Sequence, residues 1–178
     1  MEKRNLTLLT DLYELTMMNG YYLKGKTDEV AVFDVFFRRK ELITYSLAAG
    51  LEQAVDYILG LSFGEEEIAY LRGLNLFDEG FLDYLKNLKF TGDVYSVPEG
   101  TVVFPSEPIL TVKAPVIEAQ LVETAILNII NHQTLIAMKS AKVCNAAKGD
   151  NVMEFGLRRA QGPDAGIYGA AALAFDKE

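Results

Sequence analysis

The sequence has few of the residues from which metal sites and nucleophilic sites are usually built. It contains one cysteine, Cys144, one histidine, His132, and no tryptophan. A single cysteine excludes an internal disulfide and a cysteine-based metal cluster; because Cys144 lies among small residues, we expect a buried packing thiol. His132 lies inside a long helical pattern without a Ser-His-Asp or Cys-His arrangement, so we interpret it as a structural histidine. The sequence has no metal-ligand spacing, P-loop or GxGxxG motif, and no metal site is predicted.

Positive charge and long apolar runs are also scarce. The 17 lysines and arginines are outnumbered by 25 aspartates and glutamates, which gives a net charge of −8. Because an acidic chain repels a phosphate backbone, we do not expect nucleic-acid binding. Polar residues interrupt every apolar stretch, and Asp11 and Glu14 do so too early for a signal peptide. We therefore expect a cytoplasmic protein that does not bind membranes.

The first two thirds of the chain predict a mixture of helices and strands. The 178 residues, half of them hydrophobic, are enough for one ordinary domain or two small ones. Asp11 followed by Glu14 predicts a capped helix over residues 10–19. The apolar run 30–37 predicts a central strand covered on both faces. Further helices are predicted at 46–60, 64–72 and 77–90, and a small antiparallel edge sheet at 93–115.

The last third of the chain predicts the beginning of a second part. A helical pattern extends from 116 to about 148, and because one helix of that length is unusual, we expect a break near Asn131–Thr134. A short strand at 152–155 precedes a Gly-Pro-Asp turn and an alanine-rich helix. One strand–helix step cannot close a barrel. The predicted fold class is therefore α/β: an N-terminal α+β domain, residues 1–115, then an incomplete, truncated α/β barrel-like domain, residues 116–178.

Two adjacent arginines, Arg158 and Arg159, follow the predicted strand 152–155. Ligands of α/β folds bind at the carboxyl ends of strands, and the planar guanidinium fork suits carboxylates and phosphates. The alternative is that one arginine pairs with Glu154 or Asp164 while the other is solvated. The residues alone leave the anion site and the solvated surface about equally supported.

Three further candidates have a functional and a structural interpretation. Phe155 could stack on a planar ligand beside a cation, although local pattern alone favours a core residue. Tyr13 could mark an interface or be an ordinary exposed tyrosine. Arg38 and Arg39, with Lys40, follow the strand 30–37, where a solvated charge run is a simpler reading than a phosphate site.

Several stretches, in collinear order over nearly the whole chain, resemble nicotinate phosphoribosyltransferases. The two most specific are LLTDLYELTM and EFGLRRAQGPDAG. The stretches that carry the resemblance are LLTDLYELTMMNGYY (8–22), VFDVFFRR (32–39), LAAGLEQAVDYI (47–58), VPEGTVVFPSEPILTVKAPVIEAQLVET (97–124), NIINHQTLIAMKSAK (128–142) and MEFGLRRAQGPDAG (153–166).

The resemblance implies an activity and a set of partners. It implies an enzyme of NAD salvage that forms nicotinate mononucleotide from nicotinate and phosphoribosyl diphosphate, coupled to hydrolysis of ATP and with Mg²⁺. It also implies a homodimer whose active sites are shared between the subunits. In type II phosphoribosyltransferases an α/β barrel-like domain lies beside a smaller α+β domain, which agrees with the predicted fold class.

The resemblance also implies roles for individual residues. Phe155 would stack on the pyridine ring, Tyr13 of the partner subunit would cover the other ring face, and Arg158 would contact the ring ligand. Asp11 would lie beside that pocket. The residues implied to bind phosphate are Arg38, its neighbour Arg39, and Arg159.

The sequence departs from the family pattern in ways that bear on catalysis. The family's phosphorylated histidine lies downstream in a stretch that this sequence lacks, and His132 is not in that context. No catalytic residue is therefore assigned, and we expect the chain alone to be inactive. Met138 and Lys142 also replace the commoner threonine and arginine. The alternatives are a non-catalytic dimerising or complementing module derived from the enzyme, and a nicotinamide-specific relative.

Overall fold

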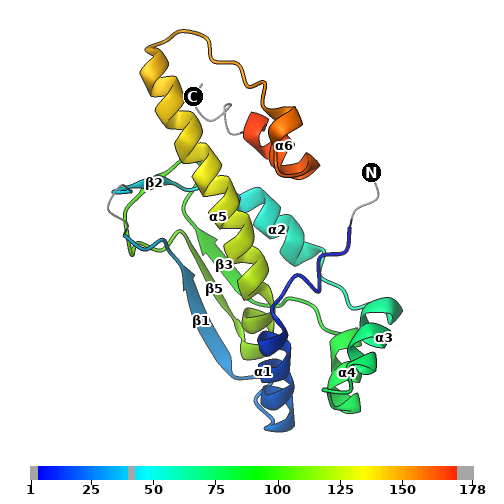
Figure 1. Cartoon of the computed structure of the whole chain (residues 1–178). Coiled ribbons are helices and arrows are strands. Elements are labelled where there is room, and N and C mark those ends of the chain that lie inside the picture. The colour runs from blue at the N-terminus through cyan, green and yellow to red at the C-terminus, as the bar shows by residue number, and fades with distance from the viewer. Residues whose placement is uncertain (1–3, 40–42, 172–178) are drawn as a thin grey trace. The chain divides into compact units, whose positions relative to one another are not determined.

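The computed structural model, drawn in Figure 1, describes residues 4–39 and 43–171. The chain divides into two units. The first unit comprises Met1–Val35, Glu52–Ser96 and Leu110–Leu127. The second unit comprises Phe36–Leu51, Val97–Ile109 and Asn128–Glu178. Each unit is discontinuous in sequence, since the chain passes between them several times. The predicted domain boundary after residue 115 stays a prediction.

Helix α1 (Leu12–Leu23) begins where the sequence predicts it, directly after Asp11. The Glu14 side chain accepts a hydrogen bond from the Asp11 backbone N–H (3.3 Å), as in a capping box. Leu15 and Met18 are buried, whereas Leu12 is half exposed, so the apolar face is narrower than predicted. The helix continues four residues beyond the predicted end because Gly20, although a poor helix former, does not break it.

An antiparallel sheet of three strands forms in the first unit, in the order β1–β5–β3. Its strands are β1 (Val30–Val35), β3 (Asp93–Ser96) and β5 (Leu110–Pro115). The prediction that 30–37 is a central strand covered on both faces is wrong. β5 is central, and β1 lies at an edge with Val30 and Val32 more than half exposed. One face of this sheet is buried and the other is open, as antiparallel sheets allow.

Three short helices complete the first unit. α3 (Glu65–Gly73) is confirmed, and α4 (Glu79–Lys86) forms within the predicted 77–90. The Asp78 side chain caps α4 by accepting from the Gly80 and Phe81 backbone N–H groups (2.8 and 3.3 Å). α2 (Leu51–Leu59) begins five residues later than predicted, because Ser46–Leu47 form strand β2 instead.

Helix α5 (Val116–Ala147) is a single unbroken helix of 32 residues, and Figure 1 shows it as the longest element of the structure. The predicted break near Asn131–Thr134 is wrong. The segment contains neither proline nor glycine, and the Thr134 hydroxyl donates to the Ala49 carbonyl (3.3 Å). Length was the only ground for the predicted break, and residues 131–134 continue the helix, with Asn131 exposed and Thr134 buried.

The second unit also contains short strands and turns. β2 pairs antiparallel with β4 (Val102–Val103), so β4 belongs to a different sheet from β3 and β5. The Glu99 carboxylate accepts from the Gly50 N–H (3.0 Å) and the Leu51 N–H (2.6 Å), where α2 begins. Gly50 has φ of +106°, a conformation that favours glycine.

The predicted strand 152–155 does not form. These residues have no regular structure, and none of the described strands pairs with them. The chain continues into a short 3₁₀ turn, η1 (Leu157–Arg159), and then α6 (Pro163–Ala171). The predicted Gly-Pro-Asp turn and the helix after it are confirmed. Within the described ranges, no helix is both long enough and apolar enough to span a membrane.

Two glycine substitutions in the first unit should have opposite effects on stability. A Cβ at Gly92 would clash with the Ala114 side chain and lie 2.6 Å from the Lys113 carbonyl oxygen, whereas a Cβ at Gly20 meets nothing within 4 Å. We expect Gly92→Ala to lower the free energy of unfolding by about 1–3 kcal/mol. Gly20→Ala, in the middle of α1, should raise it by roughly 0.5–1 kcal/mol. Urea unfolding followed by circular dichroism measures both, and equal effects would contradict the packing described here.

Candidate functional site

The start of α1 carries two of the predicted site residues and a cluster of carboxylates. Asp11 is exposed and the Tyr13 side chain is half exposed, whereas Glu14, the residue after Tyr13, is completely buried. Thr124 of α5 contacts both Glu14 and Asp11. Its hydroxyl oxygen lies 2.9 Å from one Glu14 carboxylate oxygen and 3.4 Å from Asp11 Oδ2. The first turn of α1 is therefore fastened to the part of α5 that belongs to the same unit.

Negative charge surrounds the Tyr13 hydroxyl. The pKa of Tyr13 is raised above its usual value, chiefly by the charge of Glu123, with smaller contributions from burial and from Glu14 and Asp11. The pKa of Glu123 is itself raised, mainly by burial and next by the Glu14 charge, although a hydrogen bond from Gln120 (2.9 Å) opposes this shift. A ligand that approaches Tyr13 meets an aromatic face bordered by carboxylates.

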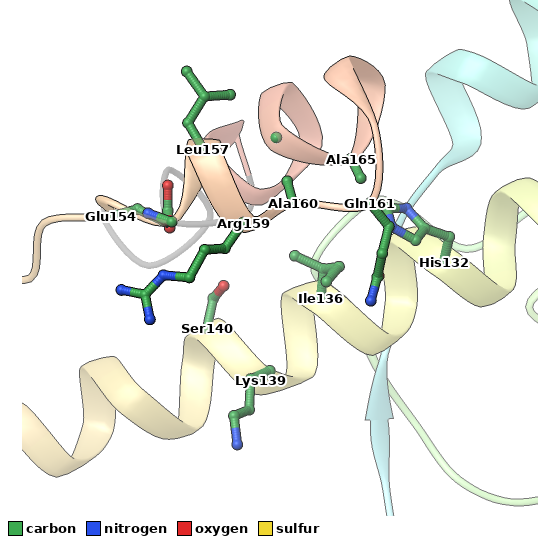
Figure 2. A pocket seen from close by; sticks show the side chains of 12 residues that line it. His132, Ile136, Lys139, Ser140, Glu154, Leu157, Arg159, Ala160, Gln161 and Ala165 are labelled. Atoms are coloured by element: carbon green, nitrogen blue, oxygen red, sulfur yellow. Dashed lines mark hydrogen bonds between the residues drawn. The ribbon is translucent and has the colours of Figure 1, made fainter.

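The second unit holds a pocket of about 360 Å³ between α5 and the segment that contains η1 (Figure 2). Arg159 lines it and extends from η1 toward the side of α5 that carries Ser140 (Figure 2). Twelve residues line the pocket: His132, Ile136, Lys139, Ser140, Glu154, Gly156, Leu157, Arg159, Ala160, Gln161, Ala165 and Gly166. The pocket combines an apolar floor with donors that suit an anionic or polar ligand.

Phe155 and Arg158 are sequence neighbours of residues that line this pocket, but neither of them lines it. Phe155 is 72 % exposed, so the reading of Phe155 as a core residue is wrong for the described chain. Arg158 is exposed as well. The Glu154 carboxylate accepts a hydrogen bond from the Gly156 N–H, and among the described residues it forms no ion pair with either arginine.

The other predicted residues are placed less specifically. Arg38 and Arg39 are exposed and have no regular structure, since β1 ends at Val35, before the two arginines. Lys40 lies outside the described residues. Cys144 is half buried, not buried as predicted.

The sequence places Phe155, Arg158 and Arg159 in one segment, but it does not point to Thr124 beside Asp11 in the first unit or to the α5 residues that line the pocket of the second unit. Thr124 lies 113 residues from Asp11, and no local pattern connects the two. His132, Ile136 and Ser140 were within reach of sequence reasoning, because their spacing of four places them on one face of a helix. His132 also contacts the Tyr168 ring edge-on, with 6.2 Å between ring centroids.

Comparisons with known proteins identify the family. Residues 8–131 match the model of the nicotinate phosphoribosyltransferase (NAPRTase) N-terminal domain. The chain belongs to the nicotinate phosphoribosyltransferase family. The family includes nicotinate phosphoribosyltransferase pncB2 of Mycobacterium tuberculosis, which is 48% identical over 159 residues, covering 89% of this chain and 34% of the relative. The Bacillus subtilis nicotinate phosphoribosyltransferase is 44% identical over 169 residues, covering 94% of this chain and 34% of the relative.

A solved structure agrees with the sequence matches. The structure of human nicotinic acid phosphoribosyltransferase superimposes with a TM-score of 0.84 at 33% identity, covering 93% of this chain and 34% of the human chain. A nicotinate-nucleotide pyrophosphorylase from Pyrococcus furiosus, at 20% identity and a TM-score of 0.71, shares the fold. The predicted mixture of helices and small sheets in an α/β fold is confirmed. The chain spans about a third of the length of these relatives.

The acidic surroundings of Tyr13 generate a testable prediction. Because a neighbouring negative charge disfavours tyrosinate, the pKa of Tyr13 should lie above 10, its usual value. Glu123→Gln removes the largest contribution and should lower this pKa without restoring it fully, since Glu14 and Asp11 remain. NMR titration of ¹³C-labelled tyrosine, assigned with Tyr13→Phe, measures the shift. The control is Glu66→Gln on α3; a Tyr13 pKa that is the same in both variants would refute the charge cluster.

Proposed function

We propose that this chain takes part in nicotinate phosphoribosyl transfer in NAD salvage, in which nicotinate and phosphoribosyl diphosphate form nicotinate mononucleotide. The observation that carries the proposal is the family match over residues 8–131 together with an exposed aromatic–arginine pair three residues apart. Nicotinate is a flat ring with one carboxylate. Its recognition needs aromatic faces and a cation, and the chain offers both.

Phe155 and Arg158 are the proposed ring contacts. The exposed Phe155 ring offers a stacking face, and the Arg158 guanidinium, which has no ion pair among the described residues, can bind the carboxylate of nicotinate through charge-assisted hydrogen bonds. Tyr13 of a second subunit would close the other ring face, with Asp11 beside it. The proposed assembly is therefore a homodimer whose sites draw on both subunits.

Phosphate binding is proposed for Arg38, Arg39 and Arg159. Phosphoribosyl transfer develops positive charge on the sugar while diphosphate leaves, so positioning of the reactants and neutralisation of the phosphates lower the barrier. Arginine suits this role because its fork of donors matches phosphate oxygens. No residue of the described chain is assigned as a general acid, general base or nucleophile.

ATP and Mg²⁺ belong to the proposal through family resemblance. Within the described ranges, no group of three or more His, Cys, Asp or Glu side chains is arranged to hold a metal ion, so no residue is assigned to Mg²⁺. Mg²⁺ is commonly bound through substrate phosphates and one or two carboxylates, which requires no cage of protein ligands. A cytoplasmic location is part of the same proposal.

A kinetic comparison of arginine variants tests the proposed function. Nicotinate mononucleotide formation is measured with nicotinate, phosphoribosyl diphosphate and Mg²⁺, with and without ATP. Arg158→Ala should raise KM for nicotinate roughly 10- to 100-fold, because it removes a charge-assisted contact, with a small effect on KM for phosphoribosyl diphosphate. Arg72→Ala, which removes an exposed arginine paired with Glu79, is the matched control and should behave as wild type.

A second candidate is a non-catalytic dimerising or complementing module, which the coverage of about a third of the relatives' length motivates. The same proteins separate the two candidates when nicotinate binding is measured by calorimetry beside turnover. Binding that Arg158→Ala abolishes, without turnover in the wild type, favours the module. Neither binding nor turnover would refute the proposed nicotinate site. Tighter binding of nicotinamide than of nicotinate would favour a nicotinamide-specific relative.

A further inference from the structure

Glu14 is a completely buried carboxylate that is held by neutral groups. Its side chain accepts hydrogen bonds from the Thr10 hydroxyl, from the Asp11 backbone N–H (3.3 Å) and from the Thr124 hydroxyl (2.9 Å). No lysine, arginine or histidine pairs with it among the described residues. Burial of a carboxylate costs free energy unless donors replace water, so these three donors are what allow Glu14 to lie there.

The three donors come from two segments of the first unit. Thr10 precedes α1, Asp11 caps it, and Thr124 lies 110 residues from Glu14 on α5. Glu14 therefore fixes the first turn of α1 in two respects. It closes the capping interaction within the turn, and it fastens the turn to α5.

The side chains that this turn presents are the ones assigned to nicotinate. Asp11 lies three residues before Glu14 and Tyr13 one residue before it, and both are exposed while Glu14 is buried. Asp11 Oδ2 also lies 3.4 Å from the Thr124 hydroxyl that binds Glu14. An exposed ring such as Tyr13 has little packing of its own, so its direction is set by the backbone that carries it.

A further buried polar group of the first unit is influenced by the Glu14 charge. The Tyr57 hydroxyl of α2 is buried and has no hydrogen-bond partner among the described residues. Burial raises the pKa of Tyr57, and the Glu14 charge adds to this shift. Because Glu14 is completely buried, it would act on a ligand through the exposed residues whose backbone it holds.

We propose that Glu14 is a positioning residue, which holds Asp11 and Tyr13 in the orientation that binds nicotinate. The inference rests on the proposed function, since the role of Tyr13 comes from it. Glu14 acts as a hydrogen-bond acceptor in this role. A glutamine, which keeps one acceptor oxygen and the side-chain length, should therefore preserve most of the effect, whereas an apolar residue of similar size should not.

The test compares Glu14→Leu, Glu14→Gln, Thr124→Val and Thr124→Ser in the full chain, with Thr27→Val as a matched control outside the cluster. In Glu14→Leu and Thr124→Val, KM for nicotinate, or Kd measured by calorimetry if the chain binds nicotinate without turnover, should rise at least about 10-fold, with kcat and KM for phosphoribosyl diphosphate within about twofold of wild type. Glu14→Gln and Thr124→Ser should recover most of this loss, because each keeps a group that can form the Glu14–Thr124 hydrogen bond.

Amide hydrogen exchange of residues 11–15, measured by NMR, gives a readout that needs no substrate. Protection should fall in Thr124→Val and be retained in Thr124→Ser. If Glu14→Leu fails to fold, Thr124→Val still decides, because Thr124 is only half buried. An unchanged KM for nicotinate in folded Thr124→Val, or equal losses in every kinetic constant, would overturn the positioning role. A wild type that neither binds nor converts nicotinate would refute the proposed function, whereas unchanged exchange protection would refute the Glu14 contact itself.

Discussion

The buried first half of α5 is the element on which the first unit depends. Its apolar side chains, among them Ile117, Leu121 and Ile126, are almost completely buried. Each buried aliphatic side chain of this kind contributes about 1.5–3 kcal/mol relative to exposure, so the helix is a principal source of stability for the elements packed on it. The central strand of the sheet, β5, leads directly into α5 at Val116, and its alternate residues Leu110, Val112 and Ala114 are buried.

Polar contacts then determine how loops and helix ends attach to this apolar framework. Glu118 near the start of α5 is buried and accepts from the Thr91 N–H (2.6 Å) and the Thr91 hydroxyl (3.0 Å). Thr124, two turns later, holds Glu14. Both contacts join a buried carboxylate to a threonine hydroxyl, and both attach a segment distant in sequence to the same helix. Since a buried carboxylate without hydrogen-bond donors is costly, each contact favours a single position of the attached segment along α5.

The fold was predictable where local chemistry decides the structure. The capping pair Asp11 and Glu14, the acidic first turn of α3 and the Gly-Pro-Asp turn before α6 are all predicted correctly, because each depends on residues at most three positions apart. Errors arose where distant partners decide. β1 is apolar enough for a central strand, but only pairing with β5 reveals that it is an edge. Residues 152–155 have the composition of a strand but no partner strand among the described residues.

The candidate site shows the same division. The adjacency of Phe155, Arg158 and Arg159 is visible in the sequence, and so is the exposure that charged residues favour. The enclosure of Glu14 is not visible, because its contact with Thr124 joins residues that lie 110 positions apart in the sequence. Resemblance to a family supplied the roles of the individual residues, which physical reasoning from composition could not supply.

Gly50 shows how little freedom the start of α2 leaves for sequence change. Its φ of +106° is a conformation that other residues rarely adopt, its N–H is bound by Glu99, and a Cβ there would lie 3.1 Å from the Gln133 Cβ and 3.2 Å from an Ile129 methyl carbon. A second mutation that shortens Gln133 would relieve the crowding but not the backbone strain. Because no single compensating change removes both penalties, an evolutionary path that replaces this glycine would first have to rebuild the turn before α2.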